Sequence, residues 1–297
     1  MSTRASHGRA ESRAPERRSD FGRAKPDGGL GARAAQPHPD QPHPELVVVK
    51  LGGTTIAAQE HVLDQVAELA RSRPVIVVHG GGARVTDWLG RLGVPTRFED
   101  GLRVTDAAAL EVAAAVLRGA LNVELVAALR ARGCDAVGVS GVDGGLLAGR
   151  RVHARGLVVT IQGVRAGLLE TLLVAGHVPV LAPLALDESG VVCNVNADDA
   201  AAGLAFGLGA GRLVLLTDVD GIRGADGARI PSLGAEQAER LIADGTIAGG
   251  MIPKVRAALR GLAPMPGAEA VIADGSRPDV LRRALDGSDL GTRIVAA

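Results

Sequence analysis

The chain has 297 residues, 46% of them hydrophobic, which is enough for one large α/β domain or two lobes with a substantial core. Aromatic residues make up only 1%, with no tyrosine, so the stacking surfaces that bind single-stranded nucleic acids are excluded. Lys plus Arg and Asp plus Glu balance at 33 each, so no net charge draws the protein to nucleic acids or anionic membranes, and any anion site must be local.

Cysteine usage and hydropathy indicate where the chain works. The two cysteines, Cys134 and Cys193, lack the spacing of a metal site and are too few for a disulfide framework, which fits a reducing cytoplasm. No apolar run approaches the ~20 residues of a membrane-spanning helix, and the N-terminus lacks the apolar core of a secretory signal. We therefore expect a cytoplasmic protein that binds neither membrane nor nucleic acid.

The first 45 residues differ from the rest of the chain. They are rich in Arg, Pro, Gly and Ser and hold few large apolar side chains, so burial does not offset the entropy lost on ordering. We predict a disordered tail over residues 1–45. An arm that binds RNA or a partner, and an upstream start codon assigned in error, are the alternatives.

Six near-continuous apolar runs follow, of the kind found in parallel strands that are covered on both faces. They occupy residues 46–50, 74–79, 136–140, 178–183, 212–218 and 270–274. Helical patterns separate them; in residues 59–73, for example, Val62, Val66 and Leu69 form one apolar stripe. The other predicted helices cover residues 107–117, 123–132, 168–175, 199–208, 235–243 and 252–262. This alternation predicts an α/β fold, a three-layer αβα sandwich with a mostly parallel central sheet.

Two glycine loops follow the first two predicted strands. The first strand ends on Lys50, with Gly52 making a turn and Gly53 free to donate its N–H; the second leads through His79 into Gly80–Gly82 and a predicted helix. A buried lysine is costly unless an anion meets it, and glycines let backbone N–H groups approach a ligand. Ligands bind beyond the carboxyl ends of parallel strands, so we expect both loops to face one crevice. Two plain tight turns are the alternative.

The usual nucleotide-binding fingerprints are missing. No G-x-x-x-x-G-K-[ST] sequence occurs, which excludes a P-loop kinase. The "GLGAG" stretch (207–211) lacks the G-x-G-x-x-G spacing and follows a helix, so we predict a helix cap and turn there. A nucleotide-dependent oxidoreductase is set aside for the same reason.

Three further stretches place polar side chains beside predicted helix starts. Arg103 precedes the capping pair Thr105-Asp106, and it either binds a carboxylate through two hydrogen bonds or faces solvent. Lys254 lies in the first turns of a helix, where a cation is unfavourable unless an anion is also bound. "CNVNADDAAAG" (193–203) sets four polar residues before an alanine-rich helix, as caps or as site residues: Asn194, Asn196, Asp198 and Asp199.

Taken in order, these stretches resemble the amino acid kinase family, and most closely its acetylglutamate kinase branch. The resemblance covers nearly everything from Leu46 to the C-terminus. It rests on "KLGG" (50–53), "HGGG" (79–82), "GLRVT" (101–105), "NVNAD" (194–198), "LLTDVDGI" (215–222), "GGMIPK" (249–254) and "GTRI" (291–294).

The resemblance implies a phosphoryl transfer. ATP, accompanied by Mg²⁺ held mainly by its phosphates, is expected to donate its γ-phosphoryl group to the side-chain carboxylate of N-acetyl-L-glutamate, in arginine biosynthesis. A carboxylate with a reference pKa of ~4.3 is already ionised at neutral pH, so no general base is needed. Catalysis then consists of positioning and charge stabilisation.

The resemblance also implies the roles of individual residues. Lys50 and Lys254 are expected to neutralise the migrating phosphoryl group, Asp198 to hold both lysines, and Gly53 and Gly81 to donate N–H groups. His79 is expected to be structural. The acceptor is expected on Gly81, Gly82, Arg103 and Asn194, with Arg103 on its α-carboxylate. The nucleotide is expected on Thr217, Asp218, Val219, Asp220, Gly221, Ile222, Thr246, Ile247 and Ala248.

Two lobes are expected from the same resemblance. Residues 46–209 would bind the amino-acid substrate and form a homodimer or higher oligomer, and residues 210–297 would bind the nucleotide. The tail shows no amphipathic stripe of the kind that joins dimers into arginine-inhibited hexamers. Residues 153–163 are brief where some relatives have a longer hairpin over the substrate, which would alter the lid.

Two rival functions remain open. A sister kinase of lysine biosynthesis phosphorylates an aminoadipyl group on a small acidic carrier protein, and "SGVDGGLL" (140–147) followed by "GRR" resembles that branch. A non-catalytic arginine or nucleotide sensor on the same fold is the second rival. The two lysines and Asp198 argue against a sensor, which has no use for such a pair.

Overall fold

The computed structural model describes residues 42–52, 60–99, 102–262 and 266–295. All of them belong to one unit of the chain, Ala32–Ala297. The predicted tail therefore lies outside the described residues up to position 41, as do Gly53 and Gly101. Its predicted end at residue 45 is too late, because the first strand starts at His43, whose N–H donates to the Gly209 carbonyl at 2.9 Å.

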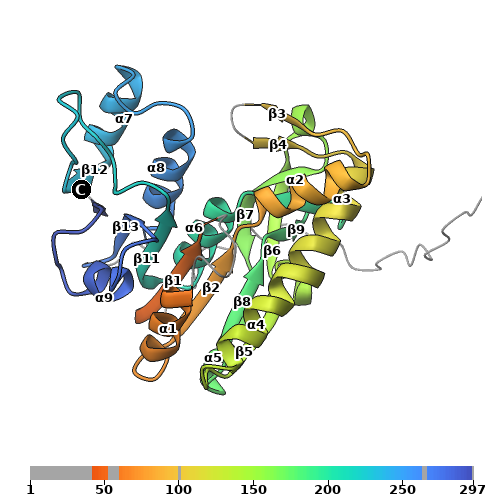
Figure 1. Ribbon diagram of the computed structural model, residues 1–297, viewed down its shortest axis with the longest axis horizontal. Coiled ribbons are helices and arrows are strands. Elements are labelled where there is room, and N and C mark those ends of the chain that lie inside the picture. Colours follow the sequence, from red (N-terminus) through yellow and green to blue (C-terminus); the bar gives the residue numbers. More distant parts are fainter. Residues whose placement is uncertain (1–41, 53–59, 100–101, 263–265, 296–297) are drawn as a thin grey trace, which may run out of the picture. The chain divides into compact units, whose positions relative to one another are not determined.

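An eight-stranded sheet organises the fold, in the order β12-β14-β13-β11-β1-β2-β8-β5 (Figure 1). Neighbouring strands run parallel except β13 and β14, so the sheet is mostly parallel, as predicted. All six predicted strands belong to it, with shifts of a few residues at their ends. The bounds are β1 (His43–Leu51), β2 (Val75–His79), β5 (Ala136–Ser140), β8 (Val178–Ala182), β11 (Ala210–Thr217), β12 (Ser232–Gly234), β13 (Glu269–Asp274) and β14 (Thr292–Val295).

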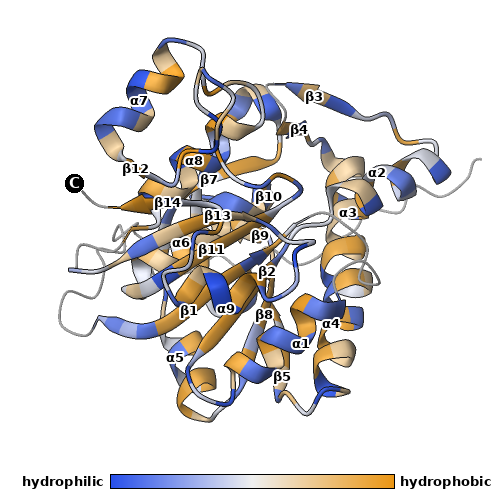
Figure 2. Ribbon diagram, turned by 60° about the vertical axis from the view of Figure 1, so that its left-hand side comes forward, coloured by the Kyte–Doolittle hydropathy of each residue, from blue (hydrophilic) through white to orange (hydrophobic). Residues whose placement is uncertain are grey.

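Apolar residues on both faces of the sheet explain the three-layer arrangement. Along β1, Val47 and Val49 pack into one core with α1, α4 and α9, while Leu46 and Val48 pack into another with α5, α6 and α8. The strands are accordingly hydrophobic along most of their length in Figure 2. The bounds are α1 (Glu60–Leu69), α2 (Gly82–Arg91), α3 (Ala107–Ala114), α4 (Asn122–Arg130), α5 (Gly167–Val174), α6 (Ala197–Gly207), α7 (Ala235–Ala243), α8 (Met251–Arg260) and α9 (Val280–Leu285).

One long helix replaces two predicted ones. A π-helical segment, Ala115–Leu121, joins α3 to α4 without a break, so separate helices over 107–117 and 123–132 are wrong. The resulting helix, Ala107–Arg130, is the one helix in the described ranges that is long and apolar enough to cross a membrane. This finding corrects the expectation that no apolar run approaches that length. Its Leu125 and Leu129 are buried against the sheet, and a core helix passes the same test.

Four short strands that the sequence did not predict form a small closed barrel: β6 (Leu147–Arg151), β7 (Val158–Val164), β9 (Leu184–Leu186) and β10 (Val192–Val195). A second unpredicted element is the antiparallel pair β3 (Arg97–Glu99) and β4 (Leu102–Val104), in which Phe98 lies opposite Arg103. Both elements carry residues of the candidate site.

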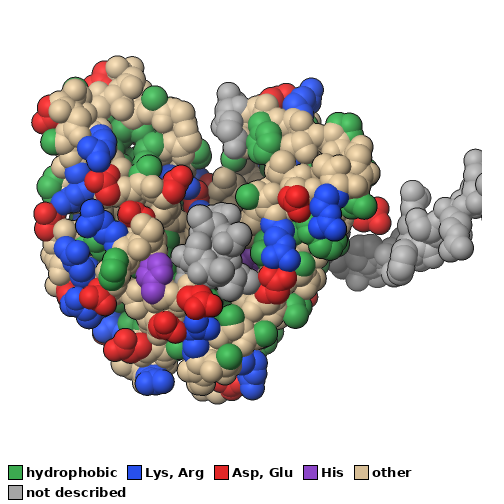
Figure 3. All heavy atoms as spheres, in the orientation of Figure 1, with side chains coloured by type: hydrophobic (Ala, Val, Ile, Leu, Met, Phe, Trp, Pro, Cys, Tyr) green, Lys and Arg blue, Asp and Glu red, His purple; other side chains and the backbone are tan. Residues whose placement is uncertain are grey.

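The surface in Figure 3 mixes the two signs of charge, with Lys and Arg interspersed among Asp and Glu on the visible face. This matches the formal net charge of zero. The same view shows the surface hollowed between the part that carries α7 and α8 and the part that carries β3 and β4.

Candidate active site

Asp198 joins two lysines from distant parts of the chain. Lys50 lies near the carboxyl end of β1, and its Nζ is 2.8 Å from Oδ1 of Asp198. Lys254 lies in the first turn of α8, and its Nζ donates to Oδ2 of Asp198 at 2.9 Å. Asp198 itself is held in the first turn of α6, where its N–H donates to the capping side chain of Asn196 at 2.7 Å. The predicted convergence of Lys50, Lys254 and Asp198 is therefore present.

The charges of this trio depend on one another. Burial raises the pKa of Asp198, but Lys50 and Lys254 outweigh burial and the net pKa is lowered, so the carboxylate is ionised. Burial lowers the pKa of Lys50, which is only 6% exposed, and Asp198 opposes that effect. Two ammonium groups share one carboxylate, which leaves a positive charge that suits an anion.

The lysine content of the chain gives a signal that the sequence analysis missed. The sequence has only three lysines, Lys25, Lys50 and Lys254, and the rest of its 33 Lys and Arg residues are arginines. Two of the three meet at Asp198. An ammonium group is a compact point charge, whereas guanidinium is a wide planar fork. In a chain that otherwise uses arginine, the two lysines indicate a place where a compact cation is needed.

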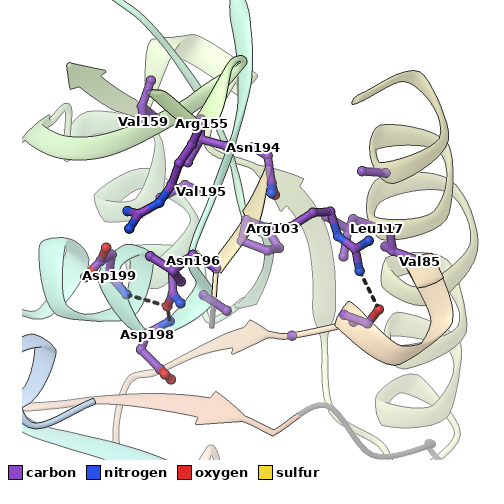
Figure 4. A pocket seen from close by; sticks show the side chains of 18 of the residues that line it. Val85, Arg103, Leu117, Arg155, Val159, Asn194, Val195, Asn196, Asp198 and Asp199 are labelled. Carbon is purple, nitrogen blue, oxygen red and sulfur yellow. Dashed lines mark hydrogen bonds between the residues drawn. The ribbon is translucent and has the colours of Figure 1, made fainter. Parts of the chain in front are cut away.

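A cavity of about 270 Å³ adjoins this trio. Part of it is drawn in Figure 4, with Arg103 and Arg155 on either side of Asn194. Its walls come from the ends of β1 and β2, the barrel, the β3–β4 pair, α3 with the π-helical segment, and the starts of α2, α6 and α8. The structure brings together on it seven residues that the sequence predicted for the site: Lys50, Gly81, Gly82, Arg103, Asn194, Asp198 and Lys254.

Arg103 is held on the cavity wall by stacking and by hydrogen bonds. Its guanidinium stacks over the cross-strand partner Phe98, with Cζ 4.8 Å from the ring centroid. Its Nη2 donates to the Gly82 carbonyl at 3.0 Å and to Oγ1 of Thr86 at 2.7 Å. Its buried Nη1 has no hydrogen-bond partner among the described residues, and burial lowers the pKa of Arg103. A desolvated donor without a partner suits an anionic ligand.

The glycine loop closes the wall between Arg103 and Lys50. Gly81 is the N-cap of α2, and a Cβ there would lie 2.5 Å from Cδ1 of Leu121 and 2.6 Å from Cδ2 of Leu117, so a larger residue would have to displace both leucine side chains. Gly82 begins the helix. The loop therefore presents backbone groups at a helix N-terminus, an arrangement that favours anions.

Other predictions about local structure are also confirmed. Asp106 caps α3 by accepting from the Ala109 N–H at 2.8 Å, and Asn196 caps α6. The "GLGAG" stretch ends α6, with Gly209 at φ +61° in the turn that follows. Asn194 lies on β10, where its Nδ2 is 3.4 Å from Oγ1 of Thr105.

Among the cavity residues that were not predicted, two bear on its charge. Phe98 supports Arg103, and Arg155 adds a second arginine from the 3₁₀ turn His153–Arg155 between β6 and β7. With it, the charged side chains on the wall are four cations, Lys50, Arg103, Arg155 and Lys254, and two anions, Asp198 and Asp199. Asp199 is already paired with Arg260. The cavity thus carries excess positive charge.

The residues predicted to bind the nucleotide lie outside this cavity. Thr217–Ile222 follow the carboxyl end of β11, and Thr246–Ala248 precede α8. Ile222 and Ile247 are both buried in the same apolar core, so the two segments are anchored by one cluster. A larger cavity, about 1410 Å³, borders the first at Leu102, Arg155, Thr160 and Asp199 and includes neither segment.

The chain is similar to several known proteins. The model of the Amino acid kinase family matches residues 45–266. Acetylglutamate kinase of Rubrobacter xylanophilus is 48% identical over 250 residues, which cover 84% of this chain and 96% of that protein. Acetylglutamate kinase of Dehalococcoides mccartyi is 40% identical over 259 residues, covering 84% and 94%. The solved structure of smu.665 from Streptococcus mutans UA159 matches with a TM-score of 0.73 at 25% identity, covering 85% and 99%.

The fold and the site define an α/β protein with a positively charged cavity at the carboxyl ends of parallel strands. The chain belongs to the amino acid kinase family.

Proposed function

We propose that the protein transfers the γ-phosphoryl group of ATP to the side-chain carboxylate of N-acetyl-L-glutamate, the second step of arginine biosynthesis. The similarity to acetylglutamate kinases along most of the chain supports this reaction. The observation that carries the proposal is the desolvated Arg103, with its buried, unpartnered Nη1 on the same cavity as Lys50 and Lys254. Two cationic positions on one small cavity suit an acceptor with two carboxylates.

Each end of the acceptor has a proposed partner. Arg103 and Asn194 bind the α-carboxylate, and stacking on Phe98 fixes the plane of the guanidinium. The side-chain carboxylate then points toward Lys50 and the glycine loop. Gly81 and Gly82 border it, and Gly53, which lies outside the described residues, stays a predicted N–H donor.

The reaction needs little covalent help from the protein. A carboxylate oxygen of the acceptor attacks the γ-phosphorus, the bond from that phosphorus to the bridging oxygen breaks, and the electron pair leaves with ADP. The products are N-acetyl-L-glutamyl 5-phosphate and ADP, and no proton is transferred. Lys50 and Lys254, aimed by Asp198, stabilise the charge on the migrating group. The side chains on the wall of the cavity are of the kinds this mechanism uses.

The proposed nucleotide site is assigned from the position of two segments in the fold. Thr217–Ile222 and Thr246–Ala248 surround the nucleotide, within a lobe that starts at residue 210 with β11. Among the described residues there is no group of three or more His, Cys, Asp or Glu side chains that could hold a metal ion. Mg²⁺ is assigned to the ATP phosphates because it usually binds through substrate phosphates and few protein carboxylates. A homodimer or higher oligomer and a cytoplasmic location complete the proposal.

The carrier-linked aminoadipate kinase is the nearest alternative, and it calls for a basic docking face. Arg256 and Arg260 line the larger cavity, but Glu239 and Asp199 neutralise them. That surface gives the alternative no support. A non-catalytic sensor would have no use for two lysines paired with Asp198, so these pairs argue against that alternative.

A coupled assay of ADP release tests the proposal. It compares free N-acetyl-L-glutamate, its one-carbon-longer homologue N-acetyl-2-aminoadipate, and aminoadipate linked to a carrier protein. We expect the highest kcat/KM with N-acetyl-L-glutamate. A higher kcat/KM with the carrier-linked acceptor would replace the proposal by its nearest alternative, and binding of ATP and N-acetyl-L-glutamate without turnover would favour the sensor.

A further inference from the structure

A buried chain of hydrogen bonds lies directly behind the glycine loop. His79, the last residue of β2, is 2% exposed, and its Nδ1 is 2.8 Å from the carbonyl oxygen of Gly80. A carbonyl only accepts, so Nδ1 carries the proton. On the other side of the ring, Nε2 is 3.2 Å from Nδ2 of Asn122. An amide nitrogen only donates, so Nε2 is the acceptor.

Asn122 uses both amide N–H donors and its carbonyl oxygen to fix this arrangement. Its Nδ2 donates to the Val180 carbonyl at 2.8 Å as well as to His79, and its Oδ1 accepts from Nη1 of Arg118 at 3.1 Å. Turning the amide over would set a nitrogen against a guanidinium and an oxygen against a carbonyl. The residue is fully buried, so the cost of such mispairing is high. Asn122 therefore selects one tautomer of His79.

The tautomer decides where the next peptide group points. In a trans peptide the C=O and N–H bonds point in opposite directions. When His79 Nδ1 draws the Gly80 carbonyl toward itself, the N–H of Gly81 is turned the other way. His79 lies behind the loop, while Gly80 and Gly81 line the cavity. The hydrogen bond at Gly80 thus directs the Gly81 N–H toward the cavity.

The long helix Ala107–Arg130 supplies both apolar and polar side chains to the glycine loop. Leu117 and Leu121 lie against Gly81, while Arg118 and Asn122 belong to the chain of hydrogen bonds behind the loop. Leu117, Arg118 and Leu121 lie in the π-helical segment. Segments of this kind occur frequently at functional sites. On the far side, a Cβ at Gly138 would lie 2.2 Å from Oδ1 of Asn122, so only glycine leaves room for the amide there. Arg118 also donates to the Gly138 carbonyl at 3.1 Å.

We propose that His79 and Asn122 are positioning residues for phosphoryl transfer: Asn122 holds His79 as the Nδ1–H tautomer, and His79 in turn aims the Gly81 N–H at the transferring group. The role assigned to that N–H rests on the proposed function. Neither side chain touches a substrate. The arrangement is stable at neutral pH, because burial lowers the pKa of His79 to about 4 and its ring stays uncharged.

A pair of substitutions at position 79 separates positioning from packing. The amide nitrogen of asparagine lies close to where histidine has Nδ1, whereas that of glutamine lies close to Nε2. We expect His79→Asn to keep kcat within about threefold of wild type, because the donor to Gly80 is retained. His79→Gln should lower kcat about 10- to 100-fold, which is at or below the loss that removal of one oxyanion donor causes. The KM values for ATP and N-acetyl-L-glutamate should change less than threefold. Equal kcat values for the two variants would overturn the proposal.

The tautomer itself is measured on the wild-type protein, so the test does not depend on a variant that folds. Nitrogen NMR of protein labelled with ¹⁵N-histidine should show His79 protonated at Nδ1 only, and Asn122→Asp, which offers Nε2 an acceptor, should move that proton to Nε2. Protonation of wild-type His79 at Nε2 would contradict the proposal. If the wild-type enzyme released no ADP with N-acetyl-L-glutamate, the proposed function would fail, while the nitrogen resonances would still decide the tautomer.

Discussion

Lys50 meets Asp198 as a buried ion pair, with Nζ 2.8 Å from Oδ1, and the other carboxylate oxygen accepts from Lys254. An Asp198→Asn amide has one acceptor oxygen, so it holds only one of the two lysines, and it removes the negative charge that pairs with both. We expect kcat to fall at least about 100-fold, by analogy with the loss of one preorganised donor. Steady-state assays of ADP release measure it.

A matched control separates this effect from the loss of any surface charge. Asp64 also pairs with a cation, Arg132, but its side chain is 65% exposed. Asp64→Asn should leave kcat within about twofold of wild type, since exposed pairs contribute about 0–1 kcal/mol. If Asp198→Asn kept kcat as well as Asp64→Asn does, Asp198 would not be the residue that aims the lysines.

Lys50→Arg tests whether a compact cation is required. The substitution keeps the charge but places a planar guanidinium where the native side chain is 7% exposed. We expect kcat to fall at least about 50-fold, a magnitude extrapolated from the cost of misplacing a catalytic group. The planar guanidinium does not fit the position of the ammonium group, so the arrangement of Lys50, Lys254 and Asp198 is disturbed. Thermal unfolding monitors the fold. A kcat close to that of wild type would show that charge alone suffices at this position.

Arg103→Lys should weaken acceptor binding rather than chemistry. Lysine cannot stack on Phe98 while donating to Gly82, Thr86 and a carboxylate together. We expect the KM for N-acetyl-L-glutamate to rise about 10- to 100-fold, in line with about 1.5–3 kcal/mol for hydrogen bonds to a charged group. The KM for ATP should stay unchanged.

The control for that variant is a second arginine stacked on an aromatic ring. Arg91 lies over Trp88, with Cζ 5.6 Å from the ring centroid, and neither residue lines the cavity. Arg91→Lys should leave the KM for N-acetyl-L-glutamate unaltered. An equal rise in KM for both variants would move the carboxylate contact away from Arg103.

The buried His79 gives the fold a pH dependence with a definite sign. The unfolded histidine, with a pKa near 6.5, takes up a proton as the pH falls, whereas burial and the nearby Arg118 keep the folded pKa at about 4, against the opposing pull of the Gly80 carbonyl. The free energy of unfolding therefore falls as the pH drops from 6.5 toward 4, by about 3 kcal/mol in total. Above pH 6.5 the residue contributes no pH dependence.

Urea unfolding at pH 7 and pH 5 measures this contribution. Between these values the wild type should lose about 2 kcal/mol more than His79→Asn, which cannot be protonated in this range. The difference between the two proteins matters, since other groups that titrate are common to both. Equal losses would show that His79 titrates alike in the folded and unfolded states.

The strands of the large sheet were predictable because each is buried on both faces. Val47 and Val49 face one core and Val48 the other, and such a run reads as apolar throughout. The barrel strands were missed because they are not continuous apolar runs; in Val158–Val164, glycine and glutamine interrupt the apolar residues. The β3–β4 pair did carry a signal, since "DG" between short alternating runs is typical of a hairpin.

Much of the candidate site was predictable from motifs, and the rest depended on tertiary contacts. Lys50 and Lys254 stand out because a strand end and a helix start are poor places for a cation without an anion. Asn122 gave no such signal, because its partners come from the end of β2, from the middle of β8 and from its own helix. The π-helical segment was equally hidden, since its leucines lie against Gly81, which is distant in the sequence.

Trapping the acyl phosphate tests the central claim most directly. Hydroxylamine converts an acyl phosphate to a hydroxamate, which mass spectrometry identifies. The wild-type protein should form N-acetylglutamyl hydroxamate only when ATP and N-acetyl-L-glutamate are both present, and Lys50→Ala, while still binding ATP, should form it at least about 100 times more slowly. Hydroxamate formation by Lys50→Ala at the wild-type rate, or none by a wild-type protein that binds both substrates, would contradict the account.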